Sequence, residues 1–112
     1  MERKKMRLII SLVLVVLLSI VAIGQTNKGS ISGTVTDEKG AAIPGATVTI
    51  TNVGTNQKTV LTTSSDGAFT ANSLDPVLYN ITVETSGFKK ALVQNIKVDT
   101  ATSSTVNVLL EI

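Results

Sequence analysis

The sequence predicts an all-β domain, a seven-stranded and mainly antiparallel β-sandwich, that follows an N-terminal signal helix. Apolar and polar residues alternate with a period of two along most of the chain after residue 30, which is typical of strands with one buried face. Turn-forming glycine, asparagine, aspartate and serine residues separate these segments at short, regular intervals. Such turns are too short for the crossovers that purely parallel sheets require.

The first 24 residues have the layout of a secretory signal peptide, and we assign residues 25–29 to a linker and residues 30–112 to the domain. Residues 1–7 are basic, and residues 8–23 form an apolar run with two serines. Small residues at Ala22 and Gly24 predict cleavage between Gly24 and Gln25. The alternative is an uncleaved membrane anchor, but this run spans only about 24 Å as a helix, whereas a hydrocarbon core is about 30 Å thick.

The net positive charge of the chain comes from this leader. Four of the ten basic residues and one of the eight acids lie in residues 1–7, so residues 25–112 carry six lysines, seven acids and a net charge of −1. The basic balance is therefore no argument for nucleic-acid binding. We expect no nucleic-acid partner, and membrane contact only through an uncleaved leader. The predicted location is outside the cytoplasm, in the periplasm, the outer membrane or the extracellular medium.

Two alternating segments, residues 31–36 and 46–51, are the first predicted strands. The core face takes Ile, Gly and Val at the odd positions of the first, and Ala, Val and Ile at the even positions of the second. Residues 37–40 (Asp-Glu-Lys-Gly) form a turn. Pro44 has no amide hydrogen, so it marks a sheet edge or a crossing between the strands.

Five more strands are predicted, at residues 57–63, 68–71, 78–85, 89–98 and 104–112. The facing of residues 57–63 is ambiguous. Residues 64–67 (Ser-Ser-Asp-Gly) are expected to be a hairpin turn, and residues 72–77 a loop that Leu74 anchors to the core. Other inward residues are Phe69, Tyr79, Ile81, Val83, Ile96, Val98, Val106, Val108, Leu110 and Ile112. Leu109 breaks the alternation of the last strand and is a candidate contact residue.

The composition argues against catalysis and against a cofactor. The chain has no cysteine and no histidine, so disulfides, thiolate or imidazole metal ligands and the usual general base are missing. We therefore predict no catalytic, cofactor-binding or metal-binding residue. The loop acids (Asp37, Glu38, Asp66, Asp75 and Asp99) are scattered over separate turns, which suits turn chemistry better than a calcium site.

Three further patterns resemble functional motifs but are better explained as ordinary structural residues. Asn80-Ile81-Thr82 matches a glycosylation triplet, but its asparagine is expected to be an outward strand residue. Lys89-Lys90 beside Phe88 is expected to be a solvated strand end with the ring in the core. Lys58, Asn80 and Glu84 have the residue types of an isopeptide cross-link, yet no spacing identifies such a bond.

Five motifs, in this order and spacing, resemble the carboxypeptidase regulatory-like domain family. They are residues 32–37 (Ser-Gly-Thr-Val-Thr-Asp), 44–48 (Pro-Gly-Ala-Thr-Val), 63–69 (Thr-Ser-Ser-Asp-Gly-Ala-Phe), 74–83 and 86–89. The resemblance covers residues 29–112 and implies a transthyretin-like (prealbumin-like) sandwich, also grouped with carbohydrate-binding-like folds. Pro76-Val77 departs from the Pro-Gly usual in the family, which restricts a positive φ in that turn. Such domains occur ahead of TonB-dependent outer-membrane receptors and as accessories to peptidases.

Three functions follow as hypotheses. The first is a non-catalytic structural or interaction module at the bacterial cell envelope, which pairs through the edge at residues 106–112 with an envelope or outer-membrane protein. Edges are expected there and near Pro44. The second is a carbohydrate-binding module, which would need an exposed aromatic ring. The third is the N-terminal extension of a TonB-dependent receptor, which requires that the gene continue past Ile112.

Overall fold

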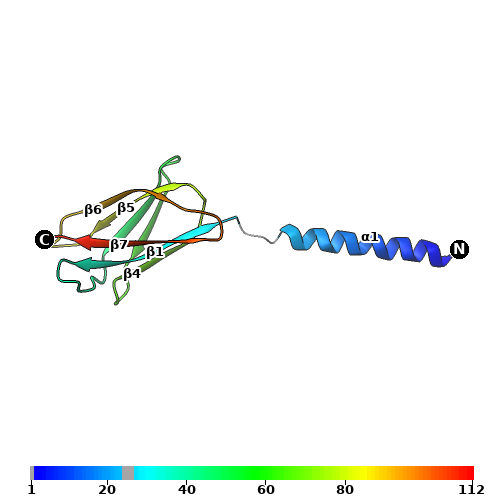
Figure 1. Cartoon of the computed structure of the whole chain (residues 1–112), viewed down its shortest axis with the longest axis horizontal. Coiled ribbons are helices and arrows are strands. Elements are labelled where there is room, and N and C mark those ends of the chain that lie inside the picture. The colour runs from blue at the N-terminus through cyan, green and yellow to red at the C-terminus, as the bar shows by residue number, and fades with distance from the viewer. Residues whose placement is uncertain (1, 24–26) are drawn as a thin grey trace.

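The structure is a computed structural model that describes the backbone of residues 2–23 and 27–112 and the side chains of residues 2–16 and 27–112. Helix α1 (Glu2–Ile23) projects away from the sandwich, and its described side chains are exposed (Figure 1). Within the described residues, no helix combines the length and apolarity that crossing a membrane requires. The predicted cleavage site, Gly24 and Gln25, lies outside the described residues.

The domain consists of seven strands in two sheets, as predicted. The strands are β1 (Gly29–Asp37), β2 (Thr47–Asn52), β3 (Lys58–Thr62), β4 (Ala68–Leu74), β5 (Leu78–Glu84), β6 (Ala91–Lys97) and β7 (Ser103–Leu110). One sheet has the order β4-β1-β7 and the other β3-β2-β5-β6. Four of the five pairings are antiparallel, and the last strand lies parallel to the first (Figure 1). That parallel pair is possible because the rest of the domain forms its crossover.

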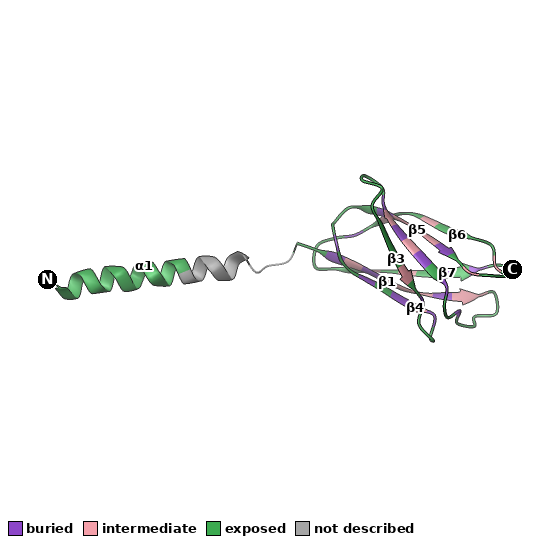
Figure 2. Ribbon diagram, turned by 180° about the vertical axis from the view of Figure 1, so that it is seen from behind, coloured by how far each residue is buried: buried purple, intermediate pink, exposed green. Residues whose placement is uncertain are grey.

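The core lies between the two sheets, and the predicted facing of the strands places it correctly (Figure 2). The inward residues of β1, β2, β5 and β7 are buried at the expected period of two, apart from the half-buried Gly33 and Val106, because successive side chains of a strand point to opposite faces. The largest fully buried side chains are Ile31, Val35, Val48, Ile50, Ile81, Val83, Val98 and Leu110. Leu74 and Phe69 are buried as expected, whereas Val106 and Ile96 are only half-buried.

Three predictions about local structure were wrong. Strand β4 continues to Leu74, so the loop before β5 is shorter than residues 72–77. Residues 64–67 do not join paired strands, because β3 and β4 belong to different sheets and the turn crosses between them. Ile112 is 85% exposed, because β7 ends at Leu110 and its alternation stops there.

The structure also settles two open points. Strand β3 turns Leu61 toward the core and Val60 outward, with 63% of Val60 exposed. Pro44 lies in a turn between β1 and β2 and is not part of a strand. Of the two predicted roles of Pro44, the crossing between strands is therefore confirmed and the sheet edge is not. The buried hydroxyl of Thr63 fixes this crossing, since it donates to the Ile43 carbonyl (2.7 Å) and accepts from the Ala46 amide (2.9 Å).

Candidate interaction edge

Each sheet of the sandwich ends in two edge strands, and three of the four carry features that hinder pairing with another chain. Strand β3 begins with a lysine, Lys58. Strand β6 has a bulge at Asn95, with a φ of 58°, and ends in Lys97. Strand β4 has a register shift against β1 near Ser73, also with a φ of 58°. Charges and bulges on an edge are devices that oppose strand addition.

The fourth edge, β7, has none of these devices. Its sequence, SSTVNVLL, contains no charge, proline or glycine, and its eight positions pair with β1 without a register shift. Among the described strands, β1 is its only ladder partner, so one side of β7 is left free. An uninterrupted, uncharged edge is the kind that adds a strand from another protein.

The register identifies the backbone groups on that free side. The Ser30 amide donates to the Thr102 carbonyl (3.0 Å), and in a parallel ladder the groups that face one partner recur at every second residue. The even-numbered residues of β7 therefore bond to β1, as the carbonyl oxygen of Val106 against Gly33 also indicates. Residues Thr105, Asn107 and Leu109 consequently direct their N–H and C=O groups away from β1.

Strand β6 lies alongside this free edge and is tied to it at both ends. The Lys89 amide donates to the Glu111 carbonyl (2.7 Å), and the Ser104 hydroxyl donates to the Lys97 carbonyl (2.9 Å). Between these ties the two strands belong to different sheets and form no ladder. We call this stretch the β6–β7 seam, which comprises residues 91–97 and 104–110.

The seam is where the core is least completely covered. Of the six half-buried hydrophobic residues that pack on the core, four lie on its strands and a fifth, Phe88, lies just before β6; the four are Ala91, Val93, Ile96 and Val106. On its rim, Leu92 and Leu109 are 57% and 53% exposed, and both line a depression of 280 Å³. Leu109, the candidate contact residue, is thus exposed, and no pattern in the sequence indicated that Leu92 would lie beside it.

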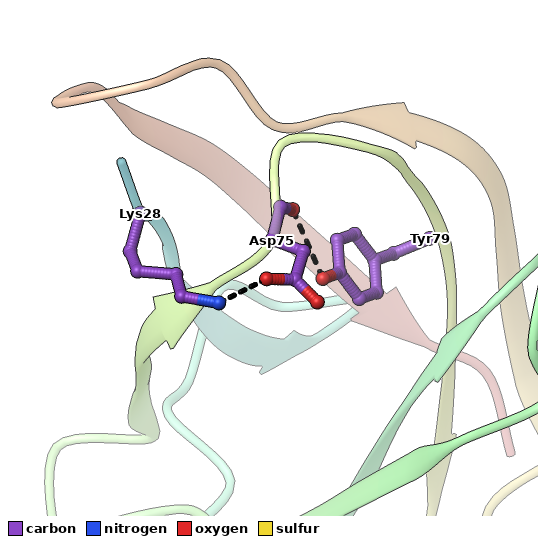
Figure 3. A network of polar contacts seen from close by, with 3 residues as sticks. All are labelled: Lys28, Asp75 and Tyr79. Carbon is purple, nitrogen blue, oxygen red and sulfur yellow. Dashed lines mark hydrogen bonds and ion pairs between the residues drawn. The ribbon is translucent and has the colours of Figure 1, made fainter. Parts of the chain in front are cut away.

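A cluster of three polar residues, separate from the seam, links the start of the domain to the loop before β5. The Lys28 ammonium is ion-paired with Asp75, and the Tyr79 hydroxyl donates to the Asp75 carbonyl (3.0 Å; Figure 3). Burial of the phenol, and next the negative charge of Asp75, raise the pKa of Tyr79 above its ordinary value. This cluster joins the residue before β1 to the loop before β5.

A polar cleft of 230 Å³ opens beside the cluster, between β3 and β4. Its polar groups are already engaged in part, since Asn52 accepts hydrogen bonds from the Gly54 and Thr55 amides. The ring of Tyr79 is only 5% exposed, and Phe69 is buried as well. Phe88 is half-buried, as its predicted packing on the core requires. Phe88 also lines a shallow depression of 560 Å³ together with Glu84 and Lys90. The two buried rings, Tyr79 and Phe69, offer no open face for stacking on a sugar.

The structure does not bring the remaining sequence candidates together. Glu84 is ion-paired with Lys90 (3.1 Å), and the Asn80 side chain accepts from the Asn95 amide (3.0 Å). Lys58 is separated from Asn80 by strand β2, so the isopeptide set is not assembled. Asp37 acts as a turn residue, as expected, because its carboxylate accepts from two amides of residues 39 and 41. In the described part of the chain, no group of acidic residues is clustered for metal binding.

The two packed sheets of seven strands define a β-sandwich module. The family model of the carboxypeptidase regulatory-like domain matches residues 30–111. The chain therefore belongs to the carboxypeptidase regulatory-like domain family, and the resemblance read from its five motifs is confirmed. A sequence comparison with curated proteins finds no match.

Solved structures with the same fold come from proteins of different kinds. The Bacillus anthracis TIE protein aligns with a TM-score of 0.66 and 22% identity over 76% of this chain and 16% of its own. A putative carbohydrate binding protein from Bacteroides uniformis gives 0.62 and 16% over 76% and 42%. Catechol 1,2-dioxygenase from Acinetobacter radioresistens gives 0.61 and 16% over 78% and 52%. This chain thus spans between about a sixth and a half of these proteins, and the likeness shows the fold alone.

Proposed function

We propose that this chain is a non-catalytic, exported module that makes protein contacts at the bacterial cell envelope through the free edge of β7. The observation that carries the proposal is the contrast between edges: β7 is uncharged and regular, whereas β3, β4 and β6 carry a lysine or a bulge. An extended segment of an envelope or outer-membrane protein would pair with the outward groups of Thr105, Asn107 and Leu109. With neither histidine nor cysteine in the chain, binding is a better-supported role than catalysis.

Site-specific photo-crosslinking in the producing bacterium tests the proposal. A photoreactive residue at Leu109 should give cross-links to envelope proteins, and one at Val60 on the opposite edge should give far fewer. Asn107→Pro should abolish the Leu109 cross-links while the domain stays folded, because the Asn107 amide faces the free edge and makes no ladder bond to β1. Equal cross-linking from both edges would refute a contact through β7.

Export itself is part of the proposal. The basic start, the apolar run and the small residues at 22 and 24 support removal of the leader between Gly24 and Gln25. The intact mass of the exported protein should correspond to a chain that begins at Gln25. A mass that includes residues 1–24 would mean that the leader is kept as an anchor.

Carbohydrate binding is the alternative function. The likeness to the putative carbohydrate binding protein from Bacteroides uniformis supports it at the level of the fold, and the 230 Å³ cleft beside Tyr79 supplies hydroxyl and amide groups. The buried ring of Tyr79 speaks against it, because sugars usually stack on exposed aromatic faces. Glycan-array binding that is lost in a folded Tyr79→Ala variant would favour this alternative over protein contact.

The second alternative is that the domain is the N-terminal extension of a TonB-dependent outer-membrane receptor, an arrangement that its family allows. The coding sequence decides this point. An open reading frame that continues past Ile112 into a receptor would make the β7 edge a candidate contact between the extension and that receptor.

A further inference from the structure

The free edge of β7 is complementary to itself. We infer that a second copy of this chain occupies it when no other partner does, through a two-fold antiparallel pairing of β7 with β7 centred on Asn107. This inference rests on the proposed function, because it names an occupant for the same edge.

The positions of the outward backbone groups fit such a pairing. In an antiparallel pair, residues that exchange both hydrogen bonds face each other and recur at every second position. A two-fold axis at Asn107 places this residue opposite its own copy and places Thr105 opposite the Leu109 of the second chain. Thr105, Asn107 and Leu109 then each meet an outward residue of the second copy, and about six backbone hydrogen bonds join the chains.

The side chains also match under this symmetry. On the outer face, the exposed Leu109 packs beside the methyl group of the facing Thr105. On the inner face, the half-buried Val106 lies opposite Val108 of the second copy, next to the seam residues Val93 and Ile96. The pairing therefore covers apolar surface at the place where each domain leaves its core least covered.

Charge favours a second copy over a charged partner. Strand β7 has no charged residue, so no like charges face each other when it pairs with itself. Around the seam, Lys90 is ion-paired with Glu84 (3.1 Å) and Lys97 with Asp99 (3.7 Å), which leaves little net field to attract an acidic or basic segment. An edge contact is smaller than the roughly 1,200–2,000 Å² of a stable interface, so the dimer is expected to be weak and reversible.

Analytical ultracentrifugation of the exported chain, purified as the cell processes it, tests the inference. Between about 10 µM and 1 mM, the range of weak affinities, the apparent mass should rise toward twice the monomer mass. Asn107→Lys and Asn107→Asp each place like charges directly opposite each other and should remain monomeric. An equimolar mixture of the two variants should dimerise again, because the facing charges are then opposite.

Val60→Lys is the matched control, since it adds a charge to the exposed face of the opposite edge strand and should dimerise like the unmodified chain. Circular dichroism establishes that each variant is folded. A chain that stays monomeric at 1 mM would overturn the inference, and so would a variant mixture that does not recover the dimer. If Asn107→Lys and Asn107→Asp each dimerise when measured separately, the contact does not lie at Asn107 and the inference is equally overturned. The proposed function fails separately, through missing cross-links from Leu109 to envelope proteins.

Discussion

Replacement of Gly33 by alanine is expected to be the most damaging single methyl addition in the domain. Gly33 lies in the middle strand of the three-stranded sheet, opposite Val106 of β7 and Phe69 of β4. A Cβ atom there would lie 1.6 Å from the Val106 carbonyl oxygen and 2.9 Å from Cζ of Phe69. The nearer neighbour is backbone and cannot rotate away, so β1 and β7 must separate and lose ladder hydrogen bonds.

Overpacking of a core typically costs about 1–3 kcal/mol, and a contact this short with backbone places Gly33→Ala at about 3 kcal/mol or more. That is a large share of the roughly 4–12 kcal/mol expected for a domain of this size. Urea unfolding, followed by far-ultraviolet circular dichroism, gives the free energy of unfolding directly.

Gly54→Ala is the matched control for this experiment. Its added Cβ would meet only the Asn52 side-chain oxygen, at 3.5 Å, so we expect a change within about 0.5 kcal/mol. Equal free energies for the two variants would show that β7 does not pack against Gly33 as described, and would also remove the basis for the outward groups on the β7 edge.

The remaining predictions concern the core, the crossing and the single tyrosine. Ile50→Ala should lower the free energy of unfolding by about 2–5 kcal/mol and Thr49→Ala by less than about 1 kcal/mol, and equal losses in urea would contradict the register of β2. Thr63→Val should cost about 1–3 kcal/mol in a thermal melt, since it leaves a buried amide and carbonyl without their partner; an unchanged melt would mean that water replaces the hydroxyl. Because the pKa of Tyr79 is raised in the folded state, stability should fall as the pH rises above the unfolded value of about 10. Tyr79→Phe should remove that loss. Absorbance titration at alkaline pH measures the pKa of Tyr79 directly, because the chain has no other tyrosine, and an ordinary pKa near 10 in the folded protein would contradict the predicted shift.

The sequence by itself determined the facing of the two central strands β2 and β5. Val48, Ile50, Ile81 and Val83 are buried as their alternation predicts, because the direction of a side chain along a strand follows from local stereochemistry alone. The turn role of Asp37 was equally predictable, since its carboxylate bonds to amides within four residues of it. The family motifs were sufficient to predict the sandwich for the same reason: they are core and turn residues with local requirements.

Only the tertiary structure decided which strands are neighbours, and therefore where the candidate site lies. The parallel pairing of β7 with β1 joins residues more than seventy positions apart, as in the pair Thr34 and Asn107, and no local pattern encodes it. The same pairing determines which amides of β7 remain free, and the packing of one sheet on the other brings Leu92 of β6 beside Leu109. Side-chain facing repeats every two residues along one strand, whereas edges and seams depend on contacts between distant strands, which alternation within a single strand cannot specify.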